Sequence, residues 1–233
     1  MAQVIEAPAR LIFAWVEYAL HPIDSTEALL RQRSDTVFSQ PVVEIWATSA
    51  VIFMLITMPV AYLFGISLKD ADFFAVWQAL ILIFHALVAL IVHAMLLAFR
   101  QRSDLTEIVK MYTITIVYIP LYGVLNLPRT FQLYNKIRAA KHDSDHIEVL
   151  TLAANLLTPV DDQLSGLNEI ATVLGYAILF TAAATFTEAI IAWYGNRRFL
   201  SYLSVGAAGV LAFIPVAGIG MPLYILNVYA HVQ

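Results

Sequence analysis

The chain has 233 residues, of which 61% are apolar and only 13% carry a charge, about half the charged fraction of an average soluble domain. This composition excludes an ordinary water-soluble globule, and the net charge of −4 excludes a basic surface for nucleic acid. Because the sequence contains no cysteine, it also excludes disulfides, thiolate metal sites and thiol nucleophiles. The remaining class is a protein of the lipid bilayer.

The N-terminal segment 1–41 precedes the long apolar tracts, and we expect it to be cytoplasmic or interfacial. Between Leu11 and Leu20 apolar residues recur at helical spacing, while Arg10 and Glu17 lie off that stripe. This pattern predicts an amphipathic helix that lies in the membrane interface. The composition of residues 25–33 favours a short second helix.

Long gaps between charged side chains locate the membrane spans, because a helix that crosses the hydrocarbon needs about 20 apolar residues. We expect a membrane domain over residues 42–233, with spans at about 45–68, 73–99, 109–128, 170–194 and 199–221. The uncharged C-terminal stretch is too long for one upright helix, and Pro215 and Pro222 interrupt it. The predicted fold is therefore all-α, a polytopic transmembrane helix bundle of five spans.

A polar insertion, residues 129–169, separates the third predicted span from the fourth. Residues 130–140 are basic and amphipathic, and residues 147–157 are apolar but too short to cross a bilayer. We expect both to form helices on the membrane surface. The run from His142 to His146 has the spacing of metal ligands, but we interpret it as a solvated turn and expect no metal and no cofactor.

The distribution of lysine and arginine favours a cytoplasmic N-terminus, because these residues resist translocation. Eight of the thirteen basic residues then lie on the cytoplasmic side: Arg10, Arg31, Arg33, Arg100, Arg102, Lys110, Arg197 and Arg198. We expect an integral protein of the bacterial inner (plasma) membrane with this orientation.

Ionisable groups inside the membrane are candidate functional residues, because each is costly unless it is paired or hydrated. Glu188 lies in the fourth span, about two turns before Arg197. With the N-terminus inside, Glu107 and Lys110 of the third span lie at a similar depth. The sequence therefore predicts a pair between Glu188 and Lys110, either structural or part of a proton or substrate site.

His85 and His93 lie eight residues apart on the second span, about 80° apart around the helix. A haem held by two histidines needs a facing histidine on another helix, and the other predicted spans contain none. We therefore expect both side chains to hydrogen-bond to neighbouring helices.

Gly206 and Gly209, with two alanines between them, form a small-residue surface suited to close helix contact. The chain contains neither the Gly-x-Ser-x-Gly pattern of an activated serine nor a phosphate-binding Gly-x-x-x-x-Gly-Lys loop. We therefore expect a contact surface and no enzymatic activity.

In the middle of the chain, the apolar helix 73–99 is followed by a polar link from Arg100 to Asp104 and by a third helix with Tyr112 near its start and Pro120 in its middle. This layout resembles the Yip1 family of five-span membrane proteins. The resemblance implies a helical membrane protein that organises partners or lipids without a catalytic centre. The Asp-Leu-Tyr-Gly-Pro motif of eukaryotic members is missing, so binding of Rab-type GTPases is not implied.

These features predict a non-enzymatic scaffold or accessory subunit of a membrane complex, in contact with membrane lipids and with other membrane proteins or itself. The alternative is a small transporter or channel. In that case Glu188 and the Pro- and Gly-interrupted fifth span line a path through the membrane.

Overall fold

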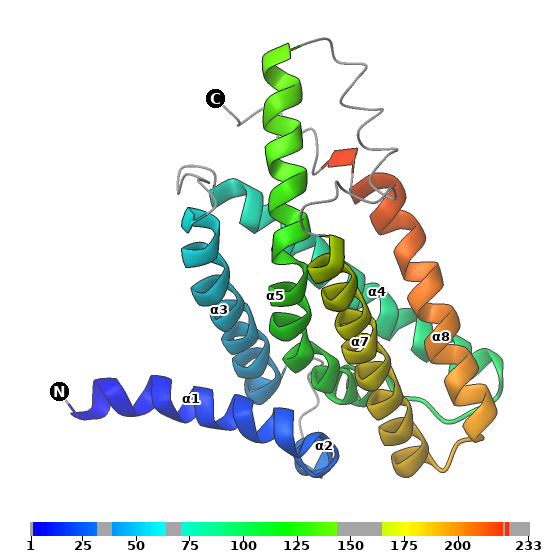
Figure 1. Cartoon of the computed structure of the whole chain (residues 1–233). Helices are drawn as coiled ribbons and strands as arrows, with labels where there is room; N and C mark the ends of the chain where they lie inside the picture. The colour runs from blue at the N-terminus through cyan, green and yellow to red at the C-terminus, as the bar shows by residue number, and fades with distance from the viewer. Residues whose placement is uncertain (1, 32–38, 64–70, 144–164, 221, 224–233) are drawn as a thin grey trace.

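The computed structural model describes residues 2–31, 39–63, 71–143, 165–220 and 222–223 (Figure 1). All regular structure in these ranges is helical, which confirms the predicted all-α fold for this part of the chain. The elements are α1 (Ala2–Leu20), α2 (Pro22–Arg31), α3 (Gln40–Leu63), α4 (Ala71–Ala98), α5 (Leu105–Asp143), α7 (Ser165–Tyr194), α8 (Arg198–Pro215) and the π-helical turn η4 (Val216–Gly220).

Four helical stretches are long and apolar enough to cross a membrane. They are Gln40–Pro59, Leu105–Leu125, Glu169–Tyr194 and Arg198–Gly220, and they correspond to the first, third, fourth and fifth predicted spans. Helix α4, at the second predicted span, runs from Ala71 to Ala98, but most side chains of its first twelve residues lie outside the described set, and the apolar stretch found in it is Ile83–Ala98. The structure thus supports four crossing helices where the sequence predicts five.

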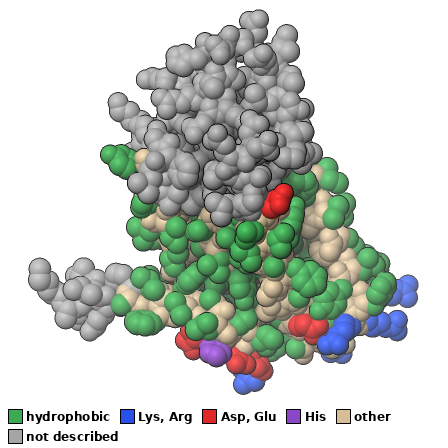
Figure 2. Space-filling view, viewed as in Figure 1, with side chains coloured by type: hydrophobic (Ala, Val, Ile, Leu, Met, Phe, Trp, Pro, Cys, Tyr) green, Lys and Arg blue, Asp and Glu red, His purple; other side chains and the backbone are tan. Residues whose placement is uncertain are grey.

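Helix α5 occupies the centre of the bundle, between α3 and α7, while α4 passes behind it and α8 lies at the outside (Figure 1). The core is built on Met111 and Ile114 of α5, with Val92 and Leu96 of α4 and Phe186 of α7, all fully buried. The flank of the bundle is instead covered by apolar side chains (Figure 2). Such a wide apolar surface suits contact with lipid.

A close approach of backbone and ring fixes how α3 meets α5. A Cβ added at Gly123 of α5 would collide with the ring of Phe53, which is buried on α3. A glycine is required here because any larger residue would push the two helices apart. Trp46 of α3 adds a hydrogen bond, from its Nε1 to Thr113 Oγ1 at 3.3 Å.

The two N-terminal helices lie at one end of the bundle, and α1 runs across it at a large angle to α3 (Figure 1). Trp15 Nε1 donates a hydrogen bond of 2.9 Å to Ser49 Oγ of α3, while Phe13 and Leu20 remain exposed. The second helix is found at Pro22–Arg31, slightly earlier than the predicted range.

The polar insertion begins differently from the prediction. Helix α5 continues unbroken from Leu105 to Asp143, so residues 130–140 continue the same helix beyond the apolar stretch Leu105–Leu125 and are not a separate helix. The reason is local, because leucine, lysine, arginine and alanine in this stretch favour helix and no glycine ends it. The predicted helix 147–157 lies outside the described residues, as does most of the run from His142 to His146.

Candidate functional site

Two short turns meet at the end of the bundle where α1 and α2 lie: residues 99–104 between α4 and α5, and residues 195–197 between α7 and α8. Asn196 binds both backbone groups of Arg102. Its Oδ1 accepts from Arg102 N–H at 3.2 Å, and its Nδ2 donates to the Arg102 carbonyl at 2.8 Å. Arg197 N–H donates to Gln101 Oε1 at 2.9 Å. Because Asn196 is buried, loss of these bonds would leave polar groups without partners.

A tyrosine strengthens the connection between the two turns. The backbone N–H of Asp104 donates to the Tyr194 hydroxyl at 3.0 Å, and this hydroxyl donates to the Asp104 carbonyl at 3.4 Å. The carboxylate of Asp104 accepts from Glu107 N–H at 3.1 Å, which is the usual role of aspartate at a helix N-terminus. The start of α5 is therefore fixed to the end of α7.

Helices α4 and α7 are each followed by a residue in the left-handed backbone conformation, but the two residues are of different types. Arg100 has φ 55° and Gly195 has φ 65°. At the end of α4, Gln101 N–H bonds to the Leu96 carbonyl and Arg100 N–H to the Leu97 carbonyl, which is the Schellman arrangement. Glycine adopts this conformation freely, whereas other residues pay about 1–2 kcal/mol for it.

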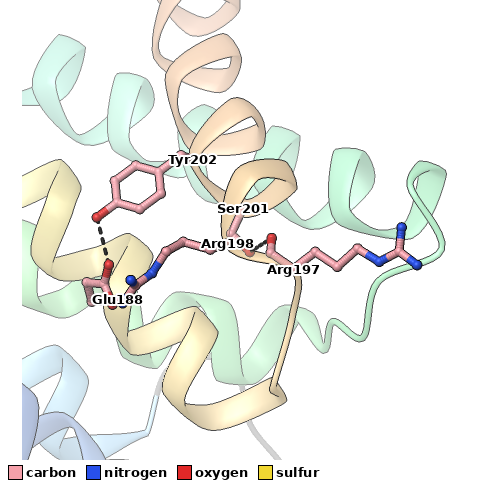
Figure 3. Close-up of polar contacts among 5 residues, drawn as sticks. All are labelled: Glu188, Arg197, Arg198, Ser201 and Tyr202. Carbon is pink, nitrogen blue, oxygen red and sulfur yellow. Dashed lines mark hydrogen bonds and ion pairs between the residues drawn. The ribbon is translucent and has the colours of Figure 1, made fainter.

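Glu188 of α7 binds two side chains of α8 (Figure 3). Arg198 Nη2 donates to its Oε2 at 3.0 Å, and the Tyr202 hydroxyl donates to its Oε1 at 2.8 Å. The expected partner was Lys110, but the turn 195–197 returns the chain so that Arg198 lies beside the last turns of α7. The Glu188 side chain is 35% exposed, which fits a place near the headgroups.

The other two members of the predicted acid–base group lie at the start of α5. Lys110 is buried and Glu107, three residues earlier on the same helix, is half-buried. The structure therefore gives Glu188 two partners on α8, Arg198 and Tyr202, while Glu107 and Lys110 lie near each other at the start of α5.

His85 makes the interhelical bond that the sequence predicts. Its Nδ1 and the Tyr112 hydroxyl share a hydrogen bond of 2.6 Å between α4 and α5. The Tyr112 ring packs edge-on against Phe186 of α7, with centroids 5.0 Å apart. All three side chains are buried, so this cluster joins three helices. His93 instead bonds through Nδ1 to Ser103 Oγ, at 2.8 Å, in the turn that follows its own helix.

The two faces of α8 have different uses. Its buried residues are small apart from one valine and pack toward α4: Ser201, Ser204, Val205, Ala208 and Ala212. Gly206 and Gly209 lie outside this buried stripe, Gly206 exposed and Gly209 half-buried, and a Cβ added to either meets nothing within 4 Å. The predicted small-residue surface is therefore not used within the described part of the chain. The internal contact uses serine and alanine instead.

Comparison with family models, with curated proteins and with solved structures finds no match to this chain. Its site must therefore be interpreted from its own geometry. Among the described residues, no three histidine or acidic side chains form a group that would hold a metal ion.

Sequence reasoning missed the residues that join the turns: Gln101, Tyr194 and Asn196. A usable signal exists, because two short polar links fall at the same end of antiparallel helices and each contains an amide side chain. Such side chains satisfy backbone groups of a facing turn. Neither link has a sequence motif that would indicate this pairing more directly.

Proposed function

We propose that this chain is a non-enzymatic integral membrane protein that acts as a scaffold or accessory subunit through the outer face of α8. The observation that carries the proposal is the pair of open glycines, Gly206 and Gly209. Lipid tails are as apolar as the side chains of a helix, so the hydrophobic effect does not drive membrane helices together. They associate instead where small residues let their backbones approach closely. The surface is therefore suited to a helix of another protein or of a second copy.

The side chains around the glycines support a shaped contact. Tyr202, Gly206, Gly209 and Phe213 follow one another at helical spacing on the same face, and the two aromatic residues are exposed. The two glycines thus leave a short stretch without side chains between two large ones, and we call this stretch the notch. A ridge of a neighbouring helix would fill the notch by van der Waals packing, which is the main force for association in lipid.

The proposed topology has five crossings, with α4 as the second, and the layout of the Yip1-like family. Alternation of α3, α4, α5, α7 and α8 places both arginine-bearing turns at the end where α1 and α2 lie (Figure 1). Lysine and arginine accumulate on the cytoplasmic side. This arrangement supports the proposed cytoplasmic N-terminus, and the bacterial inner membrane remains the proposed location.

The geometry favours this function over a transporter or channel. Glu188 lies beside Tyr202 near the start of α8, whereas the irregular backbone of the fifth span is η4, which begins at Val216. The rise of a helix separates these two positions by about 21 Å. The two features that a single transport site would combine therefore lie at opposite ends of α8.

The test is to fill the notch. A photo-crosslinking amino acid at Val210, which is exposed beside the glycines, reports any protein that contacts this face in the native membrane. We expect a crosslinked band, and we expect Gly206→Leu with Gly209→Leu to reduce it at least about tenfold, the equivalent of 1.4 kcal/mol. The matched control is Ala177→Leu, which enlarges an exposed residue of α7.

Unchanged crosslinking and copurification in the double glycine variant would contradict the proposal. A correct fold is checked by the melting temperature, which should stay the same because neither position has a neighbour within 4 Å of an added Cβ. The transporter alternative would be favoured by ion or solute flux into liposomes that Glu188→Gln abolishes.

A further inference from the structure

Four arginines project from the two joined turns. Arg100 and Arg102 belong to the turn after α4, Arg197 and Arg198 to the turn before α8 and its first residue, and all four are exposed. In the space-filling view, Lys and Arg side chains gather at this end of the molecule (Figure 2). The turns are about 95 residues apart in the sequence, yet Asn196 and Gln101 bind them together. The backbones that carry these guanidinium groups are therefore fixed relative to each other.

Three of these cations have no acidic partner among the described residues. The ion pairs in this part of the chain are Arg31–Glu27 and Arg198–Glu188, and neither includes Arg100, Arg102 or Arg197. Figure 3 shows Arg197 pointing away from Glu188, while Arg198 reaches toward it. Asp104 lies in the same turn and Glu107 just after it, so four arginines meet three acids at this end, Asp104, Glu107 and Glu188, and the patch keeps a small surplus of positive charge.

One of the arginines occupies a position that costs it conformational energy. Arg100 adopts the left-handed conformation that Gly195 adopts at the end of α7. A glycine would serve the turn at Arg100 without that cost. Strain of this kind persists where the side chain has another use, and the only group that Arg100 adds over glycine here is a stem with an exposed guanidinium.

We propose that the joined turns bind the phosphate of an anionic phospholipid headgroup between Arg100, Arg102 and Arg197. A guanidinium matches a phosphate in charge and in the geometry of paired hydrogen bonds. Because the turns are held by backbone and amide bonds, little further ordering is needed when the headgroup binds. The site lies apart from the outer glycine face of α8, so it does not depend on the proposed scaffold function.

The neighbouring apolar side chains indicate a lipid as the source of the phosphate. Phe199 directly follows the arginine pair and is 76% exposed, and Trp193 at the end of α7 is also exposed. Exposed aromatic rings at the same end of the bundle as a basic cluster are suited to the boundary between headgroups and hydrocarbon. A soluble phosphate would gain nothing from that boundary, whereas a lipid has its headgroup on one side of it and its acyl chains on the other.

The experiment measures lipid binding to the full chain in neutral detergent by native mass spectrometry. The lipids are a phosphatidylglycerol and a phosphatidylcholine with the same acyl chains, and inorganic pyrophosphate is added as a soluble competitor. We expect preferential binding of phosphatidylglycerol, and at least a tenfold loss of its affinity in Arg102→Gln with Arg197→Gln. These substitutions leave the backbone bonds of both residues in place.

The control removes the same charge elsewhere at the same end of the bundle, by Arg10→Gln with Arg31→Gln. It should leave the affinity for phosphatidylglycerol unchanged. The proposal is overturned if the control loses as much affinity, if phosphatidylcholine binds equally well, or if pyrophosphate displaces the lipid completely. The last result would identify a site for a soluble anion.

Arg100→Gly separates a ligand role from a structural one. We expect the melting temperature in neutral detergent to be unchanged or higher, because glycine relieves the left-handed conformation, and the affinity for phosphatidylglycerol to fall severalfold. An unchanged affinity in this variant would overturn the role of Arg100.

Discussion

Helices α5 and α8 are both apolar enough to cross a membrane, but they occupy opposite environments. In α5, 61% of the apolar stretch is buried inside the structure, compared with 29% in α8. Helix α5 packs against both α3 and α7, whereas α8 packs mainly against α4. Hydropathy therefore does not distinguish the helix that organises the bundle from the helix that borders it.

The glycines of the two helices show what the difference means. Gly123 of α5 lies against Phe53, and its lack of a side chain is what allows that contact. Gly206 and Gly209 of α8 face outward with no neighbour at the position of a Cβ. The same residue type therefore serves internal packing in one helix and is left available for external packing in the other.

The strongest test of this contrast is Gly123→Leu. The new side chain would enter the space of the Phe53 ring, and overpacking at a helix contact should destabilise the fold by at least about 3 kcal/mol, the upper end of the usual range. Thermal unfolding in detergent measures the loss. A variant that melts as the wild type does would show that α3 and α5 are not held at this distance.

The matched control is Gly206→Leu, which should change the melting temperature little because its Cβ has open space. A second substitution, Phe53→Ala, should restore part of the stability of Gly123→Leu by vacating the space of the ring. Additive losses in the double variant would contradict a direct contact, because residues that touch are expected to couple.

Much of the fold follows from the sequence because crossing a membrane imposes a length. The charge gaps locate α3, the first part of α5, α7 and α8, since a span is a one-dimensional property of the chain. The same gaps do not predict that α5 continues to Asp143. Beyond the span the chain is polar and rich in helix-forming residues, and charge alone does not indicate where a helix of that composition ends.

The candidate site is less predictable, because it depends on which helix faces meet. His85 is buried in an apolar helix, so a hydrogen bond to a neighbour is required wherever the neighbour lies. Glu188 has a partner supplied by the geometry of a short turn, and the sequence contains several arginines and a lysine at similar depth. In α8 both faces are apolar, so periodicity does not tell whether alanine or glycine faces inward.

A smaller loss of stability is expected from a substitution in the turn that precedes α8. Asn196→Ala removes both hydrogen bonds to the Arg102 backbone and should cost about 1–3 kcal/mol, since buried polar groups lose their partners. The comparison variant is Gln40→Ala, whose exposed side chain bonds to Glu44 and should cost much less. Equal melting temperatures for the two variants would indicate that the turns are not held together by Asn196.

The smallest loss of stability is expected for the hydrogen bond between His85 of α4 and Tyr112 of α5. Tyr112→Phe removes the hydrogen bond to His85 and keeps the ring that packs on Phe186. Single interhelical bonds in membrane proteins contribute about 0.6 kcal/mol on average and about 1.7 kcal/mol at most, so a loss in that range is expected. The same substitution in a His85→Phe background should cost less, because the bond is already absent. If Tyr112→Phe were equally harmful in both backgrounds, the loss would come from a partner of the hydroxyl other than His85, and the bond between α4 and α5 would contribute no stability.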